Sequence, residues 1–172
     1  MNSGKVFEND FASSLPSYCF KHRLRDSAQS FLKQGNTRFA WSNECDFLIF
    51  DTLRCKLFAV ELKSTKYKSM SIQTDENDAE SKMIKYHQIK SLTEFLKYDN
   101  VVPCFVLNFR DEKTNLQRTY YIHIKDFNQC VNGNEKKSIN EIDVLNNGGI
   151  RIDGVLKRTH YLWKIDELLT KI

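Results

Sequence analysis

The chain has 172 residues, of which 41% are hydrophobic and 28% charged, and its formal net charge is +4 at pH 7. This balance fits one globular domain over residues 1–172 and excludes a chain dominated by low-complexity disorder. No apolar run approaches the roughly 20 residues that a membrane helix needs, and the first residues carry no apolar signal-peptide core, so we expect a cytoplasmic protein without a membrane partner.

The first predicted elements are a helix and a β-hairpin. Residues 3–14 have a helical pattern in which Phe7 and Phe11 share one face. Residues 45–51 and 56–64 are rich in aromatic and branched side chains, which is typical of strands, and the link between them is short enough for a hairpin.

The rest of the chain alternates between polar and apolar segments. The predictions in chain order are a polar loop (64–81), a helix (79–97), a buried strand (101–109), its antiparallel partner (118–124), a helical turn (125–131), a polar connector (132–149) and a partly helical end (161–171). This order predicts an α/β fold with a mixed β-sheet flanked by helices.

The cysteines form no CxxC pair, which excludes the usual zinc spacing. In a cytosolic chain we expect them to be buried free thiols and not disulfides. They are Cys19, Cys45, Cys55, Cys104 and Cys130.

The predicted hairpin brings two acidic residues together. Side chains alternate between the faces of a strand, so Glu61 and Lys63 share one face. A turn centred between Leu53 and Arg54 places Asp46 opposite Glu61, where two carboxylates about 5 Å apart repel each other. A divalent cation between them removes this repulsion, so we expect both to be metal ligands.

Lys63 lies one step beyond Glu61 on the same face. Its ammonium group could orient a water molecule on the cation and stabilise the charge that develops on a phosphate. The alternative is a surface Glu–Lys pair at the end of a strand, but Asp46 at hairpin distance favours the site.

Two further polar residues are candidates for the same cleft. Gln88 lies four residues after Ile84 and four before Leu92, so it should face the sheet, where a buried amide needs hydrogen-bond partners. Its partner could be a metal-bound water, a substrate phosphate or Lys63, or alternatively nearby backbone. Glu8 could reach the cleft from the first helix as a further metal ligand, or its carboxylate could simply be solvated.

Motifs of other site classes are absent. The four histidines form no HExxH or HxH spacing, and no GxxxxGK[ST], GxSxG or GxGxxG sequence occurs, so we expect no nucleotide cofactor. Oxygen ligands favour Mg²⁺ or Mn²⁺ over zinc, and Mg²⁺ held by few carboxylates usually acts on a phosphate.

Basic residues are concentrated in residues 17–38, where Asp26 is the only acid. Lysines and arginines of this kind bind phosphates without reading bases, although a solvated basic surface has the same composition. The predicted nucleic-acid contacts are Lys21, Arg23, Arg25, Lys33, Arg38, Lys66 and Lys68, together with Arg110.

The sequence CDFLIFD followed by ELK resembles the PD-(D/E)xK nuclease superfamily, with Asp46, Glu61 and Lys63 in the motif positions. GKVFE near the start, ELKSTKYKS in the middle and HQIKSL in the predicted helix resemble the RecU family of Holliday junction resolvases. This resemblance extends over about residues 4–168.

The resemblance implies a restriction-endonuclease-like fold and a homodimer that binds four-way DNA junctions. It also implies phosphodiester hydrolysis with Mg²⁺ or Mn²⁺, as an endonuclease of DNA recombination and repair. Asp46 and Glu61 would be metal ligands, Lys63 the catalytic lysine, and Glu8 and Gln88 supporting residues. We expect the backbone carbonyl of Leu62 to complete the ligand set.

Two features depart from the family pattern. Cys45 stands where the motif has proline, and no clear equivalent of the RecU stalk, which enters the junction, is found between residues 13 and 43. Three other functions stay open: a restriction or repair nuclease of the same fold, a catalytically inactive DNA-binding protein, and a protein-interaction module.

Overall fold

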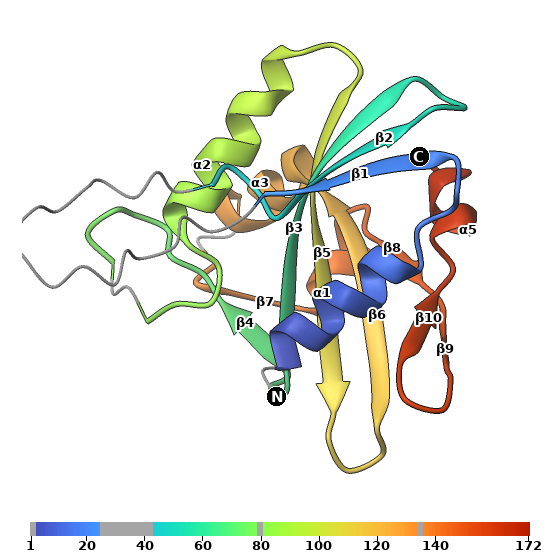
Figure 1. Ribbon diagram of the computed structural model, residues 1–172. Coiled ribbons are helices and arrows are strands. Elements are labelled where there is room, and N and C mark those ends of the chain that lie inside the picture. The colour runs from blue at the N-terminus through green and yellow to red at the C-terminus, as the bar shows by residue number, and fades with distance from the viewer. Residues whose placement is uncertain (1–2, 25–42, 79–80, 134–135) are drawn as a thin grey trace, which may run out of the picture.

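A six-stranded mixed sheet, in the order β1-β2-β3-β5-β6-β8, lies at the centre of the computed structural model (Figure 1). The structure describes residues 3–24, 43–78, 81–133 and 136–172. The strands of this sheet are β1 (Cys19–Arg23), β2 (Phe47–Asp51), β3 (Lys56–Thr65), β5 (Val101–Asp111), β6 (Leu116–His123) and β8 (Ile150–Ile152). Neighbouring strands are antiparallel except β3 and β5, which are parallel because helix α2 (Tyr86–Glu94) provides the crossover between them.

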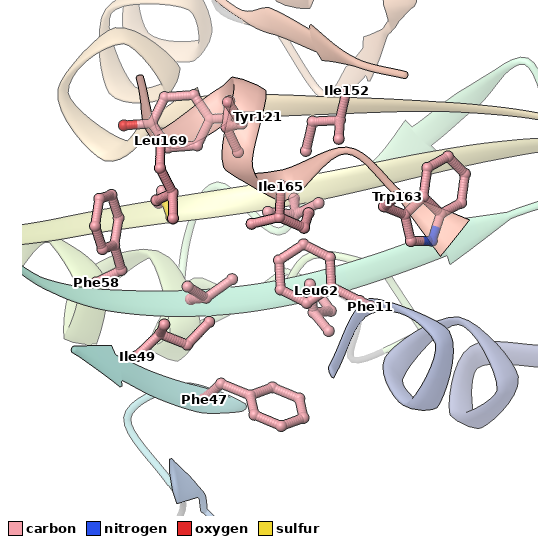
Figure 2. Close-up of a cluster of buried hydrophobic side chains, with 14 of the residues drawn as sticks. Phe11, Phe47, Ile49, Phe58, Leu62, Tyr121, Ile152, Trp163, Ile165 and Leu169 are labelled. Carbon is pink, nitrogen blue, oxygen red and sulfur yellow. The ribbon is translucent and has the colours of Figure 1, made fainter. Parts of the chain in front are cut away.

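One face of the sheet is covered by the two ends of the chain. Helix α1 (Ser3–Ser13) and helix α5 (Ile165–Leu169) pack on it with the small hairpin of β9 (Gly154–Leu156) and β10 (Tyr161–Trp163). Figure 2 shows their aromatic and branched side chains meeting those of the central strands in one cluster.

The opposite face is covered by α2 with α3 (Ile124–Asn132) and α4 (Glu141–Asn146). A 3₁₀ turn (Phe95–Lys97) extends α2. The short strands β4 (Ser69–Ser71) and β7 (Ser138–Asn140) pair with each other and contribute Met70 and Ile139 to this layer. Within the described ranges, no helix is long and apolar enough to cross a membrane.

Strand β3 is buried on both faces, which explains its continuous apolar sequence. Phe58, Val60 and Leu62 pack against the α1 side, whereas Ala59 packs against the α2 side. This alternation is the one predicted, and it points Glu61 and Lys63 towards α2.

Side chains of α1 and of Ser14, the residue after it, hold the C-terminal hairpin by hydrogen bonds to its backbone. The carboxylate of the buried Asp10 accepts the Tyr161 N–H at 2.9 Å, and the Ser14 hydroxyl accepts the Trp163 N–H at 2.9 Å. The Trp163 ring also contacts Phe7 edge-on, with 6.0 Å between ring centroids. These contacts fix α1, and hence Glu8, on the sheet.

The structure confirms the α/β class and the predicted hairpin register, in which Phe47 lies opposite Val60 and Leu48 opposite Ala59. The predicted start of β2 was wrong, because Asp46 lies just before the strand. β1 was not predicted, β4 lies in the predicted loop, and β7 and α4 lie in the predicted connector.

The predicted start of the second helix was also wrong. Ile84 is extended and bonded to backbone, with its N–H donated to Ser71 O at 3.0 Å and its carbonyl accepting the Gln73 N–H at 2.9 Å. Helix α2 therefore begins only at Tyr86.

All five cysteines are free thiols, as predicted. Cys45, Cys104 and Cys130 are buried. Cys19 is only half-buried and Cys55 is exposed in the β2–β3 turn, so the predicted burial was wrong for these two.

Asp10→Ala tests the anchoring of α1. Removing the acceptor leaves the buried Tyr161 N–H without its partner, so we expect the free energy of unfolding to fall by about 1–3 kcal/mol in urea denaturation. Asn9→Ala, at an exposed position of the same helix, should change it by less than about 0.5 kcal/mol. Equal effects of the two substitutions would contradict this role of Asp10.

Candidate active site

Glu61 is the centre of a polar cluster on the α2 side of the sheet. Its side chain is buried, with the residue only 3% exposed. The Lys63 ammonium lies 2.8 Å from Glu61 Oε1, and the Gln88 amide nitrogen donates a hydrogen bond to the same oxygen. The structure therefore brings together three residues that the sequence assigned to one site.

The local fold explains why these three meet. The two-residue period of β3 places Glu61 and Lys63 on one face. Gln88 reaches them from the first turn of α2, the helix that crosses from β3 to β5 over this face. The apolar residue Leu92, one turn further along α2, packs into the core below.

Gln88 bonds to the backbone, as one of the predicted alternatives had it, and to Glu61, a partner that was not predicted. Its carbonyl oxygen accepts the Lys85 N–H at 3.0 Å, so its amide nitrogen is turned towards Glu61. The side chain is half-buried and not fully buried. The predicted contact with the backbone and the predicted place in the site are thus compatible.

Asp46 lies at the edge of β3, where the regular pairing with β2 ends. Its N–H donates to Val60 O at 3.1 Å, and its carboxylate accepts the Leu62 N–H at 2.7 Å. The carboxylate therefore accepts the hydrogen bond that a backbone carbonyl would accept if the pairing of β2 with β3 continued. Asp46, just before β2, is therefore held beside the strand that carries Glu61 and not on a distant part of the sheet.

Burial raises the pKa of Glu61 to about 7. The nearby ammonium of Lys63 opposes this shift, whereas the negative charges of Asp46 and Glu8 add to it. A bound cation would favour the ionised carboxylate, so metal binding and ionisation of Glu61 are coupled.

The donors present fit a hard divalent cation. The N–H and C=O of a strand residue point to the same edge, so the Leu62 carbonyl lies on the edge at which its N–H meets Asp46. Asp46, Glu61 and this carbonyl provide oxygen ligands only, which suits Mg²⁺ or Mn²⁺.

Glu8 does not join this donor set. Its carboxylate pairs with Arg23 of β1, although its charge acts on Glu61. Among the residues that the structure describes, no three His, Cys, Asp or Glu side chains come together as a metal-binding group. A two-carboxylate site with a backbone ligand is the arrangement that these residues can form.

The chain resembles a protein from a bacterial prophage. It is 32% identical over 179 residues to the SPbeta prophage-derived uncharacterized protein YotM of Bacillus subtilis (strain 168), a match that covers 97% of this chain and 85% of that protein. The chain belongs to the YotM family. No family model matches it.

Cys45, next to Asp46 in this YotM-family chain, does not add a thiolate to the donors. Burial raises its pKa to about 12, and the charges of Glu61 and Asp46 add to the shift. The neutral thiol contacts the Phe47 carbonyl oxygen at 3.4 Å. The residue in the place of the motif's proline is therefore a packing residue.

The predicted basic contacts divide into three groups. Lys21 and Arg23 are on β1, where they bond to the Ala12 carbonyl and to Glu8 of α1. Arg25, Lys33 and Arg38 lie outside the described residues.

Lys66 and Lys68 follow β3 and line a hollow of about 380 Å³ at the tip of the β5–β6 hairpin. The other basic residues of this hollow are Arg110, Lys113 and Arg118, and Tyr67 there is 65% exposed. Asp111 and Glu112 also line it, and Glu112 lies 3.8 Å from Lys66 and 3.5 Å from Arg110. The sequence analysis did not predict that Lys113, Arg118 and Tyr67 belong to this hollow. The basic residues around the polar turn after the 101–109 strand could have indicated Lys113 and Arg118.

The raised pKa of Glu61 predicts a pH-dependent stability in the cation-free protein. A glutamate in the unfolded chain ionises near pH 4.5, but Glu61 in the native state ionises near 7. Between these values the unfolded chain has lost a proton that the native protein retains, so the free energy of unfolding falls as the pH rises. Above about pH 7 both states are ionised and the loss, of order 3 kcal/mol, is complete.

Urea denaturation in EDTA at about pH 5 and pH 8 measures this loss. Glu61→Gln should flatten the difference, whereas Glu94→Gln, at the exposed end of α2, should keep it. An unchanged slope in Glu61→Gln would contradict the assignment.

Proposed function

We propose that this protein is a metal-dependent, structure-specific endodeoxyribonuclease that resolves four-way DNA junctions, in the manner of the RecU resolvases it resembles. One observation carries the proposal. Glu61 is held by Lys63 and Gln88 on one face of β3, while Asp46 is fixed against the adjoining edge at Leu62. The resemblance assigned this set of residues, two acids with a lysine and a glutamine, to phosphodiester hydrolysis.

The architecture supports a restriction-endonuclease-like fold. The sheet is mixed, and helices lie on both of its faces. The antiparallel β2–β3 hairpin supplies both acids, and the α2 crossover supplies the glutamine. Function of this kind depends on the site and not on the fold alone.

Each residue then has a defined role in the proposed reaction. Asp46, Glu61 and the Leu62 carbonyl would hold Mg²⁺ or Mn²⁺, which supplies Lewis-acid stabilisation of phosphate charge. Gln88 keeps the Glu61 carboxylate in one orientation. Lys63, whose side chain is 17% exposed, presents an ammonium group that positions the attacking water and donates to a phosphate oxygen. Glu8 acts on this site through its charge.

The hollow around Lys66 and Lys68 gives the DNA a second point of contact. Lys66 follows Lys63 by three residues, so in an extended chain their Cα atoms are about 10 Å apart. This distance equals the axial rise of about three base pairs of duplex DNA. Phosphates on one side of the cleavage site would therefore lie against this hollow. Such contacts are electrostatic and carry little sequence information.

Glu61→Gln and Lys63→Ala test the proposed chemistry. Each removes a group that acts on the reacting phosphate or its cation, so we expect cleavage to fall by about 100-fold or more. DNA binding should change by less than about threefold, because the phosphate contacts elsewhere remain. Lys56→Ala is the control, since its ammonium bonds the Ile172 carbonyl at 3.0 Å at the opposite end of the same strand. Equal losses of binding and cleavage would contradict these roles.

A substrate comparison tests the junction preference. Labelled four-way junction, flap and linear duplex are incubated with the pure protein, with and without Mg²⁺. We expect metal-dependent paired cuts in the junction, DNA affinity that falls steeply with salt, and a homodimer by light scattering. Equal cleavage of flaps or duplex would indicate another nuclease of this fold. Salt-dependent binding without Mn²⁺ binding or cleavage would indicate an inactive DNA-binding protein. The absence of salt-dependent binding would indicate a protein-interaction module.

A further inference from the structure

A second hollow of about 500 Å³ lies at the start of α2 and is separate from the basic hollow at the β5–β6 hairpin. It is lined by Gln73, Glu76, Lys85, Tyr86, His87 and Lys90. The sequence predictions gave none of these residues a role in binding.

The buried side chain of Gln73 fixes the wall of this hollow. Gln73 Oε1 accepts the Tyr86 N–H at 3.1 Å, and Gln73 Nε2 donates to the Asp78 carbonyl at 3.1 Å. Gln73 is only 6% exposed. One amide therefore ties the β4–α2 connection to the first turn of α2, and the hollow is preformed.

The lining has the chemistry of a nucleotide site. Lys85 and Lys90 supply positive charge, and Tyr86 supplies an aromatic ring. Glu76 lies 3.8 Å from Lys90, but both side chains are more than half exposed, so this pair is weak and easily exchanged. Lys85 forms no ion pair with any carboxylate of the described residues.

The hollow and the candidate active site meet at the first turn of α2. Tyr86 and His87 immediately precede Gln88, whose amide touches Glu61. Successive helix residues turn by about 100°, so Tyr86 and Lys90 lie on a different face of α2 from Gln88. His87 lies between these two faces, lines the hollow and interacts electrostatically with Lys63. A strand whose phosphate lies at Glu61 and Lys63 would thus bring its next nucleotide to the mouth of this hollow.

We propose that this hollow binds an unstacked nucleotide of the DNA substrate, next to the phosphate that is cut. Its phosphate contacts Lys85 and Lys90, and its base packs on the Tyr86 ring. A base in a continuous duplex must first lose its stacking and pairing, which costs free energy, whereas an unstacked nucleotide at a branch point enters without this cost. The inference rests on the proposed function and gives it a source of selectivity for branched DNA.

Tyr86→Ala is the test, with fluorescence anisotropy in Ca²⁺ as the readout. The probes are an oligothymidylate of about ten nucleotides and a linear duplex of similar length. We expect Tyr86→Ala to weaken oligothymidylate binding by about tenfold and duplex binding by less than about twofold. Tyr86→Phe should restore binding, because it keeps the ring. Lys85→Ala should weaken oligothymidylate binding and reduce its salt dependence.

Tyr98→Ala is the matched control, since Tyr98 is 52% exposed just beyond the other end of α2. The Tyr86 N–H that bonds Gln73 is retained in every variant, and the thermal midpoint checks that each variant is folded. The inference alone would be overturned if Tyr86→Ala weakened binding of oligothymidylate and of duplex equally. It would also be overturned if Tyr86→Ala bound oligothymidylate as tightly as a wild type that binds and cleaves DNA. A wild type that binds the four-way junction but not oligothymidylate would also overturn the inference alone, whereas a wild type that binds neither the junction nor either probe would overturn both the inference and the proposed function.

Discussion

The buried carboxylate of Glu61 is the constraint around which this site is organised. A charged group on a central strand loses its hydration, and such a loss is tolerated only when partners replace the water. Lys63 and Gln88 do so at one carboxylate oxygen. Burial still raises the pKa of Glu61, and the neighbouring charges of Asp46 and Glu8 add to this shift, so the replacement of the lost water is incomplete. A cation is the kind of ligand that relieves this remaining cost.

The rest of the fold keeps the two sides of this cluster rigid. On the α2 side, Gln88 is oriented by the Lys85 N–H and cannot turn away without losing that bond. On the opposite side, Asp10 and Ser14 attach α1 to the C-terminal hairpin through buried hydrogen bonds. A site mounted on strands and anchored helices holds its geometry better than one on loops. The arrangement suits chemistry that depends on fixed distances.

The sequence predicted best where side-chain pattern and turn length both constrain the backbone. The hairpin register followed from a turn centred between Leu53 and Arg54, and it placed Glu61 on the correct face. Gln88 was placed correctly through its spacing to Leu92, although the helix begins later than the periodicity suggested. Ile84 has helical spacing to both residues, but it belongs to an extended segment that Ser71 and Gln73 hold by backbone bonds.

Short elements had no comparable signal. β4, β7 and β8 have three residues each, too few for alternation to be recognised. The pairing of Glu8 with Arg23 depends on where α1 lies relative to β1, and nothing in the local sequence of either element specifies that position. The buried role of Asp10 was invisible for the same reason, since its partner is Tyr161, at the far end of the chain.

The parallel pairing of β3 with β5 has a consequence for how the protein is made. Leu57 pairs with Val101, 44 residues later in the chain, so the central ladder closes only after the whole crossover has been synthesised. Contacts between segments so distant in sequence form late and slow the folding of a domain. Until then Glu61 stays hydrated and Gln88 is not docked. A nascent chain emerging from the ribosome therefore carries the acids of the candidate site without their arrangement, and the cluster forms only with the finished sheet.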